Sequence, residues 1–334
     1  MTAPTLPTPP RAAAATVPAG PLRPVLRTVA VLACLPYIVL KVVWVAGGRL
    51  GIPDGSVLLD HPTMMGVANG VSVLADAVVV LLALLLTRPW GLRVRAWPLL
   101  VPLWAATGLI APIMTAYPAQ LAVSLLGGNG GGTAGPPSEP FLDAWVFPVV
   151  YGGFILQGLS LGTLFVLYVR GRWGRVWSGR LRELPAAAST RGLRAAAVTG
   201  AVLALAPAAL CFLWAAGSTT GLSAGLAAPY DSDRAVVDAV RGIFLLVAAA
   251  TVLLLVLRRP GGLRVRTVMG AAWVASGAAG CWGAYMTLVS LLPAAGTGKG
   301  PTGLMVTAYA GEMIIGFLLA GCLACVLGRR SAAA

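Results

Sequence analysis

Three charged residues lie inside long apolar runs of this sequence: Lys41, Asp76 and Glu312. If these runs cross a membrane, each charge lies in hydrocarbon, where an ionised side chain is costly and usually marks an ion, proton or ligand site. At about 1.5 Å per residue along a helix, the three positions fall within ~5 Å of each other in depth. A lysine shared by two acids would leave one of them able to take up a proton.

Polar neighbours accompany these charges at helical spacing. Asn69, Ser72 and Asp76 follow an i, i+3, i+7 pattern and would form one polar stripe. Tyr309 stands three residues before Glu312 and would share its helical face. We therefore expect one intramembrane polar cluster, in which Lys41 pairs with Asp76 and Glu312 lies close enough to compete. Its expected members are Lys41, Asn69, Ser72, Asp76, Tyr309 and Glu312.

The sequence leaves two roles open for this cluster. A buried ion pair can fix the register of packed helices, and a lysine can extend its amine toward the headgroups. This role fits a non-enzymatic scaffold or accessory component. Alternatively, a protonatable group inside a membrane serves a transport path. That role fits a small-solute or proton-coupled permease that uses Lys41, Asp76 and Glu312.

The residues that could do other chemistry are sparse, and we expect no enzyme, metal ion or cofactor. His61 is the only histidine, so a triad built on histidine is improbable. Cys322 and Cys325 have the spacing of a redox pair but lie in an apolar run without a charged activator. The chain shows no nucleotide, haem or flavin fingerprint. A loosely held hard cation remains an alternative for the outward acids Asp54, Asp60, Asp231 and Asp233.

The composition indicates a membrane protein of the all-α class. Hydrophobic residues make up 58% of the 334 residues and charged residues 10%, whereas a soluble domain carries about 25% charge. The apolar runs reach the ~20 residues that a helix needs to cross a bilayer, and spanning segments of this kind must be helices. We expect eight transmembrane helices, at residues 28–48, 66–87, 97–116, 144–169, 193–216, 236–257, 267–292 and 304–327.

The placement of charge predicts the orientation. Of the 24 Lys and Arg residues, 19 lie in the two tails and in the alternate connections 88–95, 170–194 and 258–266. This is a positive-inside pattern that places both termini in the cytoplasm. The net charge of +14 then faces anionic lipid, and nucleic acid is not an expected partner. The opposite loops hold seven of the ten acids, together with Arg49, Arg234, Arg241 and Lys299.

The chain repeats itself. The basic turn Arg88–Arg95 returns 171 positions later as Arg259–Arg266 with nearly the same residues. Four crossings per half leave both halves in the same orientation, so we expect two parallel four-helix units related by a pseudo-twofold axis. Other matched segments are Trp44–Gly51 with Trp214–Gly221, Trp104–Gly108 with Trp273–Gly277, and Tyr151–Gly158 with Tyr309–Gly316. Lys41 aligns with Cys211 and Asp76 with Val247, so the second half lacks that pair.

These boundaries divide the chain into five parts. We expect a disordered cytoplasmic tail at 1–24, membrane units at 25–170 and 193–328, a basic linker at 171–192 and a C-terminal tail at 329–334. The loop between the halves alternates arginine with tryptophan, a pattern suited to the headgroup layer of an anionic membrane. A cytoplasmic protein partner is the alternative for this loop. The expected headgroup contacts are Arg170, Arg172, Trp173, Arg175, Trp177, Arg180 and Arg182.

At Trp44–Pro53 the chain resembles small bacterial membrane proteins of four helices, whose first span ends in a Trp-Ala-Leu-Gly-Gly-like run. The segments Trp104–Pro112 and Tyr151–Gly158 are similar to two-unit relatives of those proteins. This resemblance implies a polytopic protein of the bacterial cytoplasmic membrane. No activity is assigned to those proteins, so the resemblance implies a fold and a compartment alone. Lys41 stands where the small proteins often have other polar residues.

Overall fold

The computed structural model describes residues 21–60, 62–127, 142–227, 231–291 and 300–332. Over these ranges the chain forms helices and no β-strand, which confirms the expected all-α class. The long helices are α1 (Leu22–Val45), α2 (Pro62–Thr87), α3 (Ala96–Leu125), α4 (Val146–Trp177), α5 (Arg191–Ala215), α7 (Ser232–Leu257), α8 (Val265–Ser290) and α9 (Gly303–Ala332). The short ones are α6 (Ala224–Ala227), η1 (Val57–Asp60), η2 (Pro89–Arg93), η3 (Leu181–Glu183) and η4 (Ala186–Ala188).

The long helices follow the expected spans and extend several of them. Helix α1 begins at Leu22, inside the expected tail, whose residues 1–20 lie outside the described ranges. Helix α4 continues to Trp177 with one irregular residue at Trp173, so the start of the expected linker is helical. Helix α9 runs to Ala332 through most of the expected C-terminal tail.

Seven helices in the described ranges are long and apolar enough to cross a membrane. The exception among the long helices is α8, whose sequence is rich in Gly, Ala and Ser instead of Leu and Val. Helix α8 contacts α3, α7 and α9, and most of its central residues are buried. Helix α8 is therefore less apolar than the other long helices and is surrounded by them. Small residues in such a position let helices approach closely.

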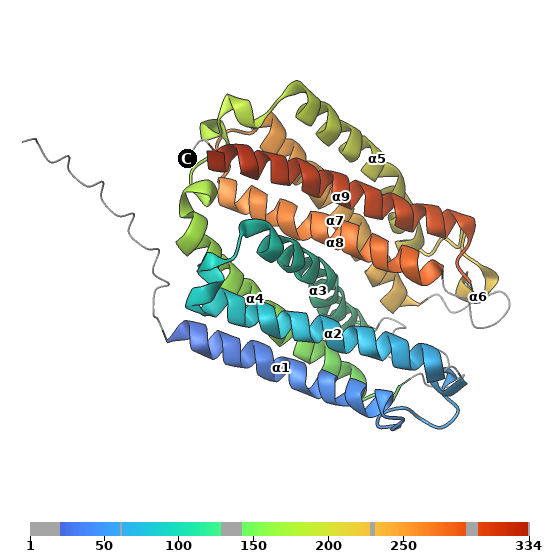
Figure 1. Cartoon of the computed structure of the whole chain (residues 1–334). Helices are drawn as coiled ribbons and strands as arrows, with labels where there is room; N and C mark the ends of the chain where they lie inside the picture. Colours follow the sequence, from blue (N-terminus) through green and yellow to red (C-terminus); the bar gives the residue numbers. More distant parts are fainter. Residues whose placement is uncertain (1–20, 61, 128–141, 228–230, 292–299, 333–334) are drawn as a thin grey trace, which may run out of the picture.

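The helices run along a common bundle direction (Figure 1). In one half α1 contacts α2 and α4, and in the other α5 contacts α7 and α9. The halves meet where α3 packs against α7 and α8. The first residues of α1 and the last residues of α9 lie at the same end of the bundle, which requires an even number of passes along it.

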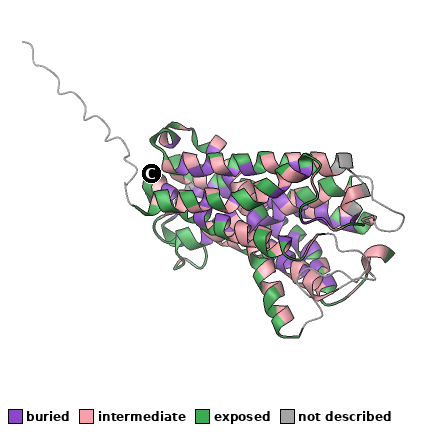
Figure 2. Ribbon diagram, turned by 90° about the horizontal axis from the view of Figure 1, so that it is seen from below, coloured by how far each residue is buried: buried purple, intermediate pink, exposed green. Residues whose placement is uncertain are grey.

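Figure 2 shows the buried residues gathered inside the bundle and the exposed ones on its outside. Many outward residues are large and apolar, among them Val67, Leu74 and Leu288, each more than 60% exposed. A soluble monomer rarely presents an apolar surface of this extent to water. The outer surface therefore matches hydrocarbon better than it matches solvent.

Glycines set the closest approaches of the central helices. A Cβ atom on Gly108 of α3 would lie 2.4 Å from the carbonyl carbon of Gly277 on α8. A Cβ atom on Gly316 of α9 would lie 2.2 Å from the backbone nitrogen of Gly280, also on α8. Since both obstacles are backbone atoms, a side chain at either position would push the helices apart.

The segment that follows α4 forms backbone hydrogen bonds with the second basic turn, Arg259–Arg266. The Leu181 N–H donates to the Leu263 carbonyl at 3.0 Å, and the Arg182 N–H donates to the Gly261 carbonyl at 3.2 Å. The side chains of Leu181 and Leu184 are buried. The backbone of this segment is thus held by the second basic turn, and its contact with lipid headgroups stays a prediction.

Candidate functional site

Lys41 lies on α1 among neutral groups. Its Nζ donates a hydrogen bond of 2.7 Å to Oδ1 of Asn69 on α2. The same ammonium lies 4.9 Å from the ring centroid of Tyr37 and 5.0 Å from that of Trp44, about one helical turn to either side. At these distances the ring faces attract the cation. One amide and two rings thus hold the charge of Lys41.

Asp76 lies about two turns further along α2 and is the incomplete member of this first cluster. Its side chain is buried, and Oδ2 accepts no hydrogen bond from the described part of the chain. Lys41 attracts it electrostatically, but the two do not come within the 4.0 Å of an ion pair. Ser72 turns its hydroxyl to the carbonyl of Ala68, at 2.8 Å. A buried carboxylate without a direct partner is costly, so packing alone does not account for Asp76.

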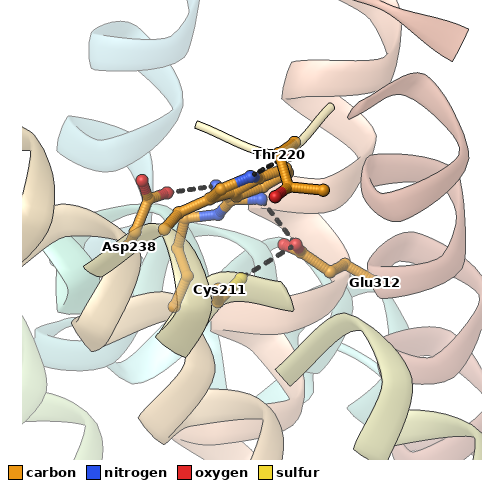
Figure 3. A network of polar contacts seen from close by, with 6 residues as sticks. Cys211, Thr220, Asp238 and Glu312 are labelled. Atoms are coloured by element: carbon orange, nitrogen blue, oxygen red, sulfur yellow. Dashed lines mark hydrogen bonds and ion pairs between the residues drawn. The ribbon is translucent and has the colours of Figure 1, made fainter. Parts of the chain in front are cut away.

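A second cluster surrounds Arg241 of α7. Its Nη1 donates to Oδ1 of Asp238 at 2.8 Å, and its Nη2 donates to Oε1 of Glu312 on α9 at 2.5 Å. Figure 3 shows Asp238 and Glu312 approaching from opposite sides. The ring centroid of Tyr309 lies 4.9 Å from the guanidinium carbon, and the Cys211 thiol donates to Glu312 at 3.7 Å. All three charged side chains are less than 10% exposed.

The six expected cluster residues are therefore divided between two sites. Lys41, Asn69, Ser72 and Asp76 lie together on α1 and α2. Tyr309 and Glu312 lie with Arg241, and the charges that act on Glu312 are those of Arg241 and Asp238. The carboxylate of Glu312 is thus paired with Arg241 of its own half and does not compete for Lys41.

The sequence interpretation counted Arg241 and Asp238 with the outward loops, although both lie inside the expected span 236–257, and the structure corrects that count. They stand inside α7, where Asp231 caps the helix well before them by accepting a hydrogen bond of 2.9 Å from the Arg234 N–H. Two signals pointed to this site. Asp238 and Arg241 are three residues apart and share a helical face. Glu312, moreover, is an acid inside an apolar run, which requires a cation nearby.

The first helix of each half ends in the same turn. The Trp44 indole N–H donates to the Leu50 carbonyl at 2.7 Å, and the Trp214 indole N–H donates to the Thr220 carbonyl at 2.9 Å. The backbone φ angles are 85° at Gly47 and 73° at Gly51, and 88° at Gly217 and 74° at Gly221. Only glycine adopts these angles without strain. The repeated Trp and Gly residues therefore have the same structural role in both halves.

Two apolar cavities lie away from both clusters. A crevice of about 540 Å³ opens between α3, α4, α8 and α9, and a cavity of about 330 Å³ lies between α3, α4, α7 and α8. None of the charged cluster residues Lys41, Asp76, Asp238, Arg241 and Glu312 lines either of them.

The expected headgroup contacts differ in their surroundings. Arg172 donates to the Val94 carbonyl at 2.7 Å and lies 4.8 Å from the Trp173 ring, so it fastens α4 to the first basic turn. Trp173 and Trp177 line the larger crevice. The remaining members are exposed: Arg170, Arg175, Arg180 and Arg182.

Sequence reasoning overlooked two Gly-x-Ser-x-Gly segments, which contain Ser160 and Ser223. The strained strand-to-helix turn that exposes a nucleophile in hydrolases is absent at both: Ser160 is buried inside α4, and Ser223 lies in a turn before the short helix α6. His61 lies outside the described ranges. Within those ranges no group of three or more His, Cys, Asp and Glu side chains is arranged to hold a metal ion.

Comparisons of the chain with known family models, curated proteins and solved structures return no match.

Proposed function

We propose that this chain is an integral membrane protein of eight transmembrane helices in a bacterial cytoplasmic membrane, with both termini in the cytoplasm. The seven apolar helices and the apolar outer surface support this placement. We count α8 as the eighth span because it runs among α3, α7 and α9 and does not need a lipid-facing composition. The shared end of the bundle for α1 and α9 agrees with eight passes.

The same proposal includes two tandem four-helix units. Helix contacts in the first half have counterparts in the second: α1 with α2 and α4 matches α5 with α7 and α9. Gly108 and Gly277, which occupy equivalent places in the repeat, touch each other across the halves. Equivalent residues meet in this way at a twofold axis.

We propose that the protein acts as a non-enzymatic scaffold or accessory component. The observation that carries this proposal is the closed centre, where α3 and α8 meet backbone to backbone at Gly108 and Gly277. The charges near this centre are held by internal partners or lie away from the two cavities. A transported solute needs an aqueous path to such charges, and a scaffold does not.

Accessibility labelling tests this proposal. In a variant without the native cysteines, single cysteines would be introduced as Asp76→Cys, Ser276→Cys, Ser178→Cys and Leu125→Cys. A membrane-impermeant maleimide should label the last two, each from one face of the membrane only, because both are exposed and the proposed topology puts the end of α3 and the end of α4 on opposite faces. It should label neither of the first two. Labelling of Asp76→Cys would contradict the scaffold, and labelling of Ser178→Cys from the exterior would contradict the topology.

One observation favours a second candidate, a proton-coupled permease. Oδ2 of Asp76 is buried and unpaired beside a lysine, and a carboxylate in that state can bind a proton or a cation. Under this alternative, reconstituted protein would carry protons across vesicles and Asp76→Asn would abolish the flux. A flux that is the same in Asp76→Asn as in the unmodified protein would exclude Asp76 from the path.

A further inference from the structure

The larger crevice has an unusual lining for a membrane protein surface. Five tryptophans and one phenylalanine line it, from helices of both halves: Trp97 and Trp104 of α3, Trp173 and Trp177 of α4, Trp273 of α8 and Phe317 of α9. A volume of about 540 Å³ is typical of a small-molecule site. A helix of a partner protein is about 10 Å in diameter, so this volume would hold little more than one turn of it.

The crevice runs along the bundle from the end that carries the basic turns. On α9 its lining extends from Ser331 back to Phe317. At 1.5 Å per residue this is ~20 Å, which is close to the depth of one leaflet, about half of the ~30 Å hydrocarbon core plus a headgroup. An extended acyl chain has this length and thickness.

Two buried hydrogen-bond donors without acceptors lie on residues beside the crevice. The indole N–H of Trp273, which lines the wall, has no acceptor in the described part of the chain. Nη1 of Arg330, next to the lining residue Ser331, has none either, although Nη2 donates to the Ser178 carbonyl at 2.6 Å. The ester and phosphate oxygens of a phospholipid are hydrogen-bond acceptors.

Positive charge gathers at the same end of the crevice. The exposed residues Arg95, Arg175 and Arg329 are direct sequence neighbours of lining residues. A phosphate group at this end would lie on the side of the protein that carries these cations, and arginine pairs well with phosphate oxygens. The inner leaflet of a cell membrane supplies such anionic headgroups.

We propose that this crevice binds one anionic phospholipid, with an acyl chain against the tryptophans and the phosphate at Arg330. The proposal rests on the membrane placement proposed above. It adds to that placement a defined lipid site between the two halves, formed by α3 and α4 from one and by α8 and α9 from the other. The bound chain would complete the contact between the halves where protein side chains leave a space.

The test uses the full chain in phosphatidylcholine vesicles that contain phosphatidylglycerol with a photoreactive acyl chain. Cross-links should concentrate on the crevice segments of α4 and α9. Gly321→Leu should lower the cross-linking yield roughly tenfold, because the leucine side chain would take the space of the acyl chain. Gly321 lines the crevice, and nothing lies within 4 Å of an added Cβ atom. Gly311→Leu is the matched control, since it lies on the same helix, has equal room and does not line the crevice.

A second arm examines the headgroup. The same photoreactive chain on phosphatidylcholine should give a several-fold lower yield, and Arg330→Gln should remove the difference between the two lipids. Equal yields from both lipids in the unmodified protein would overturn the anionic site. If Gly321→Leu does not fold, Gly328→Leu replaces it, because Gly328 also lines the crevice and has equal room.

Three other outcomes would overturn the inference or separate it from its premise. Equal labelling of Gly321→Leu and Gly311→Leu, or cross-links spread evenly over the outer surface, would show an ordinary lipid boundary and overturn the site. Cross-linking of a co-purified protein at the crevice in place of the lipid would also overturn it. Release of the chain from membranes by alkaline carbonate would instead overturn the membrane placement itself.

Discussion

The two halves differ in how they hold a cation between their helices: Lys41 is half-buried and Arg241 is buried. In the first half Lys41 rests on an amide and two rings, and Asp76 lies near it without a hydrogen bond to Oδ2. In the second half the guanidinium of Arg241 bonds directly to both Asp238 and Glu312. The second cluster is thus locked by ionic hydrogen bonds, whereas the first leaves an acceptor free.

This difference arises on a shared framework. The turns after Trp44 and Trp214 match in hydrogen bond and in backbone angle, and Tyr151 and Tyr309 occupy equivalent places in the repeat. The cation, however, comes from the first helix in one half and from the second helix in the other. Such divergence is compatible with the proposed repeat, because the site depends on a few side chains and the fold depends on many. Any activity that needs a free carboxylate should reside in the first half.

Replacing Arg241 should have the largest effect. In Arg241→Met, Asp238 and Glu312 stay buried without a cation, and the removal of one member of a buried ion pair costs about 3–5 kcal/mol of unfolding free energy. Lys41→Met should cost roughly 1 kcal/mol, since its contacts are with neutral groups. Unfolding by SDS in mixed micelles measures both. Equal losses would show that the two clusters are not different in kind.

A control separates lost attraction from lost packing. Adding Asp238→Asn and Glu312→Gln to Arg241→Met removes the stranded charges and should recover a good part of the stability. No recovery would mean that the arginine acts through its volume.

The next largest effect compares Gly316 with Gly158, which are equivalent in the repeat. Gly316→Ala places a Cβ atom against the backbone of α8 and should cost about 1–3 kcal/mol, the usual range for overpacking. Gly158→Ala meets the side chains of Met114 and Ile110 in place of backbone atoms, and both border the smaller cavity, so it should cost less than Gly316→Ala. Thermal unfolding in detergent measures both. A reversed order would mean that α8 and α9 can separate more easily than the backbone contact suggests.

Replacing the tryptophan of either turn should have an equal effect, smaller than that of Gly316→Ala. Trp44→Phe and Trp214→Phe each remove an indole N–H and strand one carbonyl, which should cost roughly 1–2 kcal/mol in each half. The same unfolding measurement gives both values. A clear difference between the two losses of stability would mean that one turn contributes more to the free energy of unfolding than the other.

The smallest expected effect is the coupling between Lys41 and Asp76. A double-mutant cycle with Lys41→Met and Asp76→Asn should give roughly 0.5–1 kcal/mol, because the charges attract without touching. The corresponding cycle for Arg241 and Glu312 should give a larger value. A coupling of zero would mean that the two residues of the first cluster are independent.

The sequence predicts the long helices well because each is one unbroken apolar run. The expected span 193–216 becomes α5 at Arg191–Ala215, and Thr190 caps its start by accepting a hydrogen bond from the Leu193 N–H at 3.4 Å. The end of α3 was harder to predict. It reaches Leu125 through Pro112 and Pro118, which helices tolerate where neighbouring groups satisfy the freed backbone atoms.

The site was predicted in part. Lys41, Asn69 and Asp76 could be brought together because helical spacing puts them on facing stripes of adjacent helices. The partner of Glu312 could not, since a charge near the end of an apolar run is equally compatible with a loop or a core. Only the packing of α7 against α9 decides that Arg241 points inward. The positions of the charges in the sequence do not indicate this contact between α7 and α9.

Under the eight-span topology proposed above, the small residues of α8 also bear on how the chain integrates into a bilayer. A segment so poor in leucine and valine gains little from leaving the translocon by itself, and its favourable contacts are with α7, already synthesised, and α9, still to come. We therefore expect a chain truncated after Ser290 to leave this segment unintegrated, and a chain extended through Ala332 to integrate it. Biogenesis of the second half would then be a cooperative event among its last three helices, completed only when synthesis is nearly over.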